Sequence, residues 1–133
     1  MISLDSSGLF AYVNQRDIDH HRVKAALEGE PGAWIIPAPI LCETAYLLEH
    51  RSTPAALDAF LGDLERGVFV LDCGEGDIGR IRELVRRYAD LPLGVVDASV
   101  IACAERHGGR VLTLDLRHFG VVAREGRLTL LPT

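Results

Sequence analysis

Two aspartates stand directly after short apolar runs of the sequence. Asp5 follows the run Ile2–Leu4, and Asp115 follows the run Val111–Leu114. Both runs are typical of buried β-strands. In open parallel sheets ligands bind at the carboxyl ends of the strands, which makes both aspartates candidate site residues. The structural alternative for each is a helix N-cap or an Asx turn, both common for Asp after a strand.

Two further acidic residues lie among apolar neighbours. The helical neighbours of Glu43 at i−3 and i+4 are Ile40 and Leu47, which predicts that Glu43 lies on the core-facing stripe of a helix. Asp97 lies inside the apolar run 95–101. A charge on an apolar face is rarely left unpaired. The alternatives are an ion pair with a buried arginine for Glu43 and an N-cap for Asp97, although the valine three residues after Asp97 cannot complete a capping box.

A cluster of these carboxylates would require a cation. Two carboxylates about 5 Å apart repel each other by roughly 3 kcal/mol at an effective dielectric constant near 20. Ligands that are all oxygen favour Mg²⁺ or Mn²⁺ over zinc, and such an ion can orient and deprotonate water and stabilise charge on a phosphate. We therefore predict one acidic site that binds a divalent metal and hydrolyses a phosphodiester. Its predicted metal ligands and catalytic residues are Asp5, Glu43, Asp97 and Asp115.

The elements that must position this site form an alternating pattern. Short β-type runs alternate with segments of helical period, which predicts a three-layer α/β/α sandwich around a mainly parallel sheet of four to five strands. The predicted strands are 2–4, 33–36, 68–71, 111–114 and 128–131. Helices are predicted around 9–13 and 23–27, then over 39–50, from Pro54 to Gly67, over 75–88 and over 95–107. In the helix over 75–88, the residues predicted to point inward are Ile78, Ile81, Val85 and Tyr88.

Composition narrows the class of protein. A chain of 133 residues, 48% of them hydrophobic and 25% charged, predicts a single globular domain over 1–133 with its own core. Its three cysteines have no zinc-ligand spacing, and no signal peptide or membrane-spanning run is present, so we expect a cytoplasmic protein.

The net charge of −5 argues against a large basic face for nucleic acid. However, 13 of the 14 basic residues are arginine, which suits bidentate phosphate contacts.

Four motifs together resemble the PIN-domain nucleases. They are Leu-Asp-Ser-Ser at 4–7, Leu-Cys-Glu-Thr at 41–44, Val-Asp-Ala-Ser at 96–99 and Thr-Leu-Asp-Leu-Arg-His-Phe at 113–119. Their order, their spacing and the chain length are similar to those of the single-domain VapC-type toxins of bacterial toxin-antitoxin pairs. No single motif is specific, but the ordered set covers essentially the whole chain.

The resemblance implies an endoribonuclease toxin whose four acids hold Mg²⁺ or Mn²⁺. It implies a homodimer and a cognate antitoxin whose C-terminal segment crosses the active-site groove. It also implies that Ser6 or Ser7 hydrogen-bonds within the site. Bound cations would make the acidic site attractive to RNA phosphates, which answers the objection from net charge. Candidate contacts with RNA or the antitoxin are Arg117, Arg80 and Arg87, the last two within the arginine group 80–87. The Asp/His stretch 17–21 is interpreted as structural.

Other functions remain as alternatives. Receiver domains require an early acidic pair and a late lysine, but Lys24 is the only lysine. Haloacid-dehalogenase phosphatases require Asp-x-Asp, whereas this chain has Asp5-Ser6-Ser7. A PIN-like nuclease outside a toxin-antitoxin system and a catalytically silent interaction module of the same fold are the two remaining alternatives.

Overall fold

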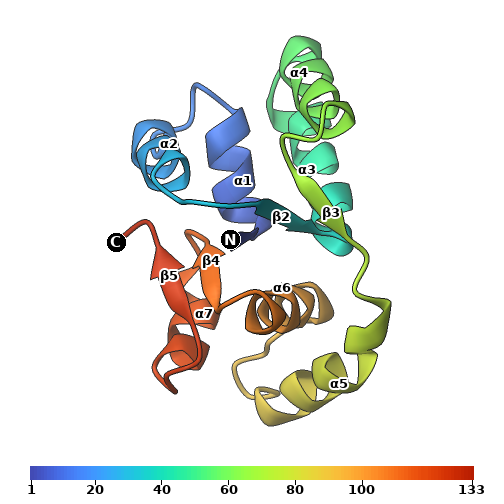
Figure 1. Ribbon diagram of the computed structural model, residues 1–133, viewed down its shortest axis with the longest axis vertical. Coiled ribbons are helices and arrows are strands. Elements are labelled where there is room, and N and C mark those ends of the chain that lie inside the picture. Colours follow the sequence, from blue (N-terminus) through green and yellow to red (C-terminus); the bar gives the residue numbers. More distant parts are fainter.

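A five-stranded parallel sheet forms the centre of the protein (Figure 1). The computed structural model describes all residues from 1 to 133. The strands are β1 (Ile2–Leu4), β2 (Trp34–Pro37), β3 (Val70–Asp72), β4 (Arg110–Leu112) and β5 (Thr129–Leu131). Their order across the sheet is β3-β2-β1-β4-β5, and every neighbouring pair is parallel. The predicted α/β class and parallel sheet are therefore confirmed.

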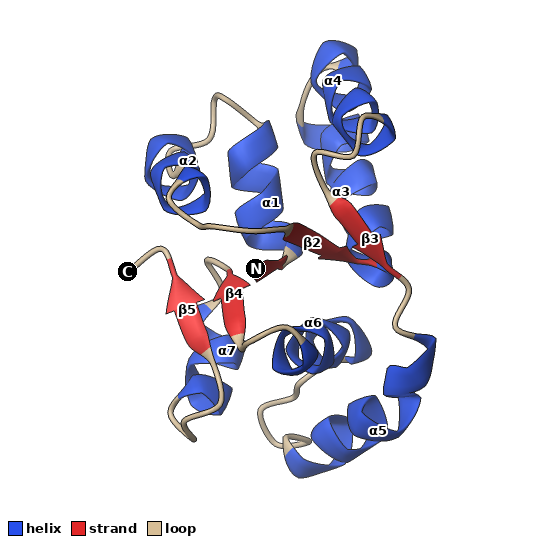
Figure 2. Ribbon diagram, viewed as in Figure 1, coloured by secondary structure: helices blue, strands red, loops and turns tan.

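Helices cover both faces of this sheet. They are α1 (Ser6–Val13), α2 (His20–Glu28), α3 (Ala38–Arg51), α4 (Pro54–Glu65), α5 (Ile78–Arg87), α6 (Val95–Arg106) and α7 (Leu116–Ala123), and a 3₁₀ turn, η1 (Glu75–Asp77), precedes α5. Figure 2 shows α1, α2 and α4 on one side of the sheet and α5 and α6 on the other, as in a three-layer sandwich. The sequence pattern did not predict α7, which has only eight residues.

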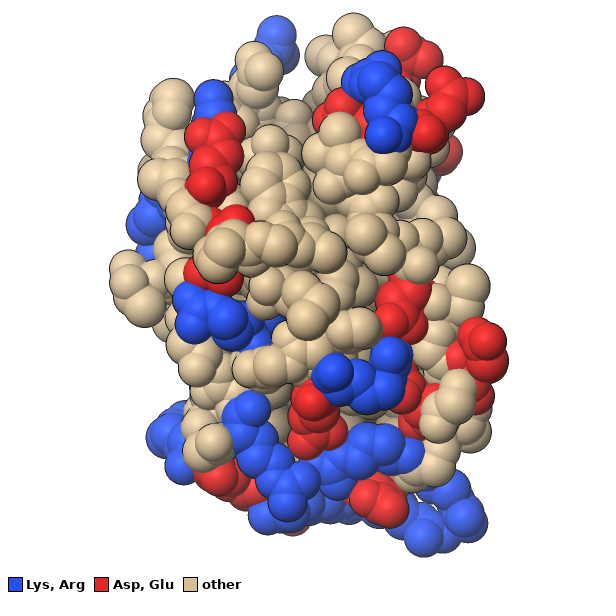
Figure 3. Space-filling view, in the orientation of Figure 1, with Lys and Arg blue, Asp and Glu red and all other residues tan.

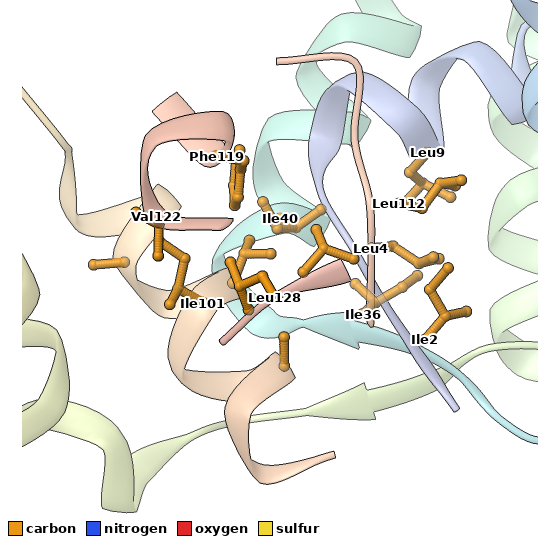
Figure 4. Close-up of a cluster of buried hydrophobic side chains, with 14 of the residues drawn as sticks. Ile2, Leu4, Leu9, Ile36, Ile40, Ile101, Leu112, Phe119, Val122 and Leu128 are labelled. Carbon is orange, nitrogen blue, oxygen red and sulfur yellow. The ribbon is translucent and has the colours of Figure 1, made fainter. Parts of the chain in front are cut away.

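The core lies on both sides of β1 and β4. Every residue of α6 from Ala98 to Ala104 is buried, as its nearly all-apolar sequence predicts. Figure 4 shows Phe119 and Val122 of α7 on the same side as Ile101 of α6 within one cluster of buried apolar side chains. Because α7 is anchored by Phe119, which is fully buried, the residues at its N-terminus are held in place against the sheet.

Helix α5 differs from its predicted orientation. Ile78 was predicted to point inward but is 67% exposed, whereas Leu84 and Tyr88 are buried. The reason is that residues 75–77 form the 3₁₀ turn η1, so that α5 begins only at Ile78 and this residue is not yet packed against α6. Strand β3 also begins two residues later than predicted, because the Val68 amide donates to the carbonyl of Asp63 in the turn that ends α4.

Helix α1 approaches strand β4 unusually closely at Gly8. A Cβ atom at this position would lie 2.8 Å from the carbonyl oxygen of Leu112 and 2.9 Å from the Leu112 Cγ. A glycine is therefore required here for close packing of the helix on the strand. None of the helices combines the length and the apolar character that crossing a membrane requires.

Arg106 at the end of α6 holds two carboxylates on the β3 side of the molecule. Its guanidinium donates to Asp72 at 2.9 and 3.1 Å and to Asp77 at 2.8 Å through two nitrogens. His107 Nε2 lies 2.9 Å from Asp72 Oδ2. The hydrogen bonds from Arg106 lower the pKa of Asp72 to about 2. Because both Asp72 oxygens accept from Arg106, this group, which also adjoins the buried Cys103, is a structural ion-pair cluster.

Replacing Arg106 by alanine should make the folded protein less stable, and it should make that stability less dependent on pH in acid. The pKa of Asp72 in the folded protein is below its usual value of 3.8. The contribution of Asp72 to folding stability is therefore complete above pH 3.8 and is lost as the pH falls towards about 2. We expect Arg106→Ala to reduce the free energy of unfolding by about 2 kcal/mol at neutral pH. Chemical denaturation at several pH values, from neutral pH down to about 2, checks both effects, with substitution of the exposed Arg86 by alanine as the control. Equal acid sensitivity of wild type and Arg106→Ala would contradict the assignment.

Candidate active site

Asp5 and Asp115 are brought together by the pairing of β1 with β4. The two strands are parallel neighbours with Leu4 opposite Leu112, so their carboxyl ends lie side by side. The Asp5 amide donates to the Leu112 carbonyl at 3.0 Å. Asp5 is the N-cap residue of α1, and Asp115 is the N-cap residue of α7. The chain therefore turns from strand into helix at each aspartate, and both lie at the same edge of the sheet.

A hydroxyl network links these two positions. Thr113 Oγ1 and Ser7 Oγ each donate to Asp5 Oδ2 at 2.8 Å. Thr113 Oγ1 in turn accepts from the Asp115 amide at 3.0 Å, and Ser7 Oγ accepts from the Leu114 amide at 2.9 Å. The Asp5 carboxylate is therefore held by side chains from α1 and from the end of β4, while it does not cap its own helix.

Asp5 is almost fully buried, with 4% of its surface exposed. Burial raises its pKa above the usual value, and the negative charge of Asp97 raises it further, while hydrogen bonds from Ser7, Thr113 and the Ser6 backbone lower it. Of the two serines that follow Asp5, Ser7 thus acts through its hydroxyl and Ser6 through its backbone. A buried carboxylate whose pKa is raised is poised to gain stability from a bound cation.

Thr113 is a site residue that the sequence did not reveal as one, because its role depends on the adjacency of β1 and β4. Thr113→Val removes the hydroxyl that joins Asp5 to the Asp115 amide while keeping the side-chain shape. We expect a 10- to 100-fold lower metal affinity or cleavage rate, as is typical when a group that orients a ligand is lost. Metal titrations and initial cleavage rates check this. Thr113→Ser should behave as wild type, and equal losses in both variants would refute the hydroxyl's role.

Asp97 is the centre of the acidic group. It is the third residue of α6 and half-buried, and the backbone of Gly94, the N-cap residue, hydrogen-bonds to its carboxylate. Burial raises the pKa of Asp97, the charges of Asp115 and Glu43 raise it further, and His118 lowers it. Because Asp97 also raises the pKa of Asp5, its carboxylate interacts with each of the other three. The N-cap role considered for Asp97 is therefore replaced by a hydrogen bond back to the N-cap residue.

Asp115 is held by His118, which lies one turn later in α7. The His118 amide donates to Asp115 Oδ1 at 3.1 Å, and His118 Nδ1 lies 2.8 Å from Asp115 Oδ2. One ligand atom from each of Asp97, Asp115 and His118 lies within 4.8 Å of the others. His118 was not identified from the sequence, because α7 was not predicted. Its signals in the sequence were its place in the motif at 113–119 and its spacing of three residues from Asp115.

Glu43 lies on a different face of its helix from the one predicted. It is exposed, whereas the buried residues of α3 are Ile40, Thr44 and Leu48. Of the two apolar neighbours of Glu43, Ile40 belongs to the core-facing stripe and Leu47 flanks it, while Thr44 occupies the inward position next to Glu43. Glu43 forms no ion pair with arginine, but its charge raises the pKa of Asp97. It therefore borders the acidic group from the solvent side.

The acidic group has the chemistry of a cation site. None of its four carboxylates is paired with an arginine or lysine, and the only basic partner is His118. Burial is the main cause of the raised pKa of Asp5 and Asp97, and repulsion between converging carboxylates without a counter-ion raises both further. The donor set of carboxylate oxygens and one imidazole fits a divalent metal.

The three arginines considered as RNA or antitoxin contacts have different surroundings. Arg80 donates to both oxygens of Glu105, at 2.8 and 2.9 Å. Arg87 donates to Glu125 at 2.6 Å. Arg117 is exposed, forms no ion pair and follows Asp115 by two residues. Figure 3 shows basic side chains gathered at the lower end of the molecule with acidic ones among them. Arg117 is thus the one of the three whose charge is free beside the acidic group.

Comparisons with known proteins identify the family of this chain. The PIN domain family matches residues 2–125. Ribonuclease VapC26 of Mycobacterium tuberculosis is 32% identical over 133 residues, which cover 97% of this chain and 98% of that protein. Two solved structures share the fold. VapC20 of Mycobacterium tuberculosis, described as a sarcin-ricin loop cleaving toxin, has a TM-score of 0.79 at 22% identity, covering 96% of this chain and 97% of VapC20.

The second structure is FitAcB from Neisseria gonorrhoeae, with a TM-score of 0.65 at 15% identity, covering 99% of this chain and 97% of that chain. At these identities both structures support the fold alone. The sequence relative and the family match cover nearly the whole chain, and all four motifs lie within the matched residues. The chain therefore belongs to the PIN-domain family and, within it, to the VapC-type ribonucleases.

Proposed function

We propose that this protein is a Mg²⁺- or Mn²⁺-dependent endoribonuclease that acts as the toxin of a toxin-antitoxin pair. The observation that carries the proposal is the position of Asp97, whose carboxylate interacts with three other carboxylates and with His118 but with no arginine or lysine. Such a group gains stability from a bound cation, and the carboxyl ends of parallel strands, where Asp5 and Asp115 lie, are where such sheets bind ligands. Because its substrate is RNA, we place the protein in the cytoplasm.

Each residue has a defined part in this proposal. Asp5, Asp97 and Asp115 would hold the metal, and Glu43 borders it from solvent. His118 holds Asp115 in one orientation and adds an imidazole, a ligand that suits Mn²⁺ better than Mg²⁺. Arg117, the free cation beside Asp115, is suited to bind the RNA phosphate that the acidic group alone would repel. When bound, the metal supplies water activation and stabilisation of the charge that develops on the phosphate.

Metal-dependent cleavage by the purified protein tests the proposal. Freed of any partner and treated with EDTA, the protein should leave total RNA intact, and added Mg²⁺ or Mn²⁺ should restore cleavage at defined positions. Mapping the new RNA ends identifies the sequence that is read. Cleavage that persists undiminished in EDTA would overturn the metal role, and intact RNA at all metal concentrations would overturn the ribonuclease function.

An antitoxin is the proposed protein partner. A cavity of about 610 Å³ lies between the α1–α2 connection and the α3–α4 pair, at the opposite end of α1 from Asp5. It combines apolar side chains such as Tyr12 and Phe60 with the cations Arg16, Lys24 and Arg51. This lining suits a further apolar segment of the antitoxin with acidic flanks, at a position separate from the active-site groove that the family resemblance assigns to the antitoxin's C-terminal segment. A short neighbouring gene encoding a DNA-binding protein would support the pairing, and co-purification of its product would test it.

A homodimer is also proposed, from the family resemblance. Exposed apolar side chains along β3 and the start of α5 offer a surface for it, namely Val70, Leu71 and Ile78. Edge strands of this kind are rarely left long and apolar unless they are covered. Light scattering on the purified protein should give twice the mass of the chain, and a monomeric mass at high protein concentration would exclude the dimer.

A further inference from the structure

Helix α3 displays an ordered aromatic pair on its exposed face. Tyr46 is 60% exposed, and its ring stacks on that of His50 with 4.1 Å between centroids and 27° between planes. His50 Nδ1–H donates to the Tyr46 carbonyl at 2.8 Å, which fixes the imidazole against the tyrosine. The pair is therefore oriented before any ligand binds, with one face of Tyr46 covered by His50 and most of its remaining surface open to solvent.

This pair lies beside the acidic group. Tyr46 follows Glu43 by three residues, a spacing that places two side chains on one helical face with their Cβ atoms about 5–6 Å apart. Both residues line one surface depression together with Cys42 and Leu47. Helix α3 packs against α6, the helix that carries Asp97, and the Glu43 charge acts on Asp97. The depression therefore borders the acidic group.

The chemistry of the depression suits a planar, uncharged ring. An exposed aromatic ring with an open face provides a stacking surface, and unpaired bases of single-stranded RNA bind proteins by stacking on such rings. A contact with a second copy of the chain is the competing explanation for exposed apolar surface. A stable interface buries about 800 Å² on each partner, however, and this depression has only four lining residues.

We propose that Tyr46, oriented by His50, is a base-stacking platform that positions one nucleotide of single-stranded RNA next to the scissile phosphate. The platform rests on the proposed ribonuclease function and adds a residue that selects the substrate. Stacking acts equally on the ground state and the transition state, so it lowers KM and leaves kcat nearly unchanged. It also favours substrates with an unpaired base at that position over duplex RNA.

Steady-state cleavage of a short single-stranded RNA containing the mapped cleavage site tests the platform. Tyr46→Ala should raise KM about 5- to 100-fold, the effect expected for the loss of one stacked base. Tyr46→Phe and Tyr46→Trp keep a stacking ring and should stay within about twofold of wild type. His50→Ala should have a smaller effect than Tyr46→Ala. Leu61→Ala, which removes an exposed apolar side chain of α4, is the control and should change nothing.

The outcomes separate the platform from the function on which it rests. If the wild type cleaves and Tyr46→Ala cleaves with the same KM at the same positions, the platform is wrong and the ribonuclease stands. If the wild type does not cleave, the function is wrong, and quenching of a 2-aminopurine base in a short single-stranded RNA decides whether Tyr46 stacks on a base: quenching by wild type but not by Tyr46→Ala supports stacking, and equal quenching by both overturns it. Loss of dimer mass in Tyr46→Ala would instead make this surface a contact between copies and overturn the proposal.

Discussion

Asp97→Asn is expected to reduce RNA cleavage by about a thousand-fold, because a metal ion that stabilises the developing charge is worth several kcal/mol. Asparagine keeps the shape of the side chain and can still accept the hydrogen bond from the Gly94 backbone. What it loses is the negative charge that interacts with each of the other three carboxylates. Of all single substitutions in the acidic group, this one should therefore affect metal binding most directly.

The same substitution should not weaken the metal-free protein. The folded pKa of Asp97 is above its usual value of 3.8, so its ionised form is disfavoured in the fold, and wild-type stability falls as the pH rises through that raised pKa. At neutral pH, Asp97→Asn should therefore unfold at the same temperature as the metal-free wild type or above it. Loss of activity caused by misfolding would instead lower the unfolding temperature.

The effect of metal on the unfolding temperature further distinguishes loss of metal binding from misfolding as the cause of lost activity. A ligand present at a hundred times its dissociation constant adds about 2.7 kcal/mol to folding stability. Mn²⁺ should raise the unfolding temperature of the wild type and of Asp58→Asn, an exposed aspartate of α4 that serves as the control. It should raise that of Asp97→Asn much less. Equal metal-induced shifts in all three proteins would mean that the metal binds elsewhere.

Gly8→Ala is expected to disturb both the fold and the site. The added methyl group would meet the Leu112 carbonyl oxygen at 2.8 Å, and backbone cannot rotate away as a side chain can. We expect a loss of about 3 kcal/mol in unfolding free energy, at the upper end of the usual cost of overpacking. Helix α1 must also move away from β4, which stretches the hydrogen bonds from Ser7 and Thr113 to Asp5. A displacement near 1 Å can reduce catalysis about a hundred-fold.

A second helical glycine provides the matched control. A Cβ atom at Gly79 in α5 would meet no atom within 4 Å. Gly79→Ala should therefore be neutral or up to about 1 kcal/mol more stable, from helix propensity alone. Denaturant unfolding and cleavage rates of both variants check the difference. If Gly8→Ala were as stable and active as Gly79→Ala, the close packing of α1 on β4 would not be needed to form the site.

The parts of the fold that follow from local pattern could be predicted from the sequence. Three features depend on neighbouring residues only: the nearly all-apolar helix α6, the alternation of strands and helices, and the place of Asp5 and Asp115 after strands. The order β3-β2-β1-β4-β5 depends on pairing between distant segments, and no local signal specifies it. The role of Thr113 depends on that order, because its hydroxyl reaches Asp5 only where β1 and β4 are adjacent.

The directions in which the Glu43 and His118 side chains point could not be predicted from the sequence. Apolar residues at i−3 and i+4 of Glu43 indicated a buried carboxylate, but two neighbouring faces of α3 carry apolar residues, and the one that faces the core includes the polar Thr44. His118 lies in a helix too short for its period to be distinctive. The metal site was thus predicted from four acids, whereas the structure adds an imidazole to the group and moves Glu43 to its edge.

The anomalous scattering of Mn²⁺ in crystals grown with the ion tests the central claim most directly. We expect a peak bonded to carboxylate oxygens of Asp97 and Asp115, with Asp5 or His118 completing the ligand set, and no such peak in crystals of Asp97→Asn. A well-occupied peak elsewhere, for example at Asp72, Cys103 and His107, or no peak near Asp97 at saturating Mn²⁺, would contradict it.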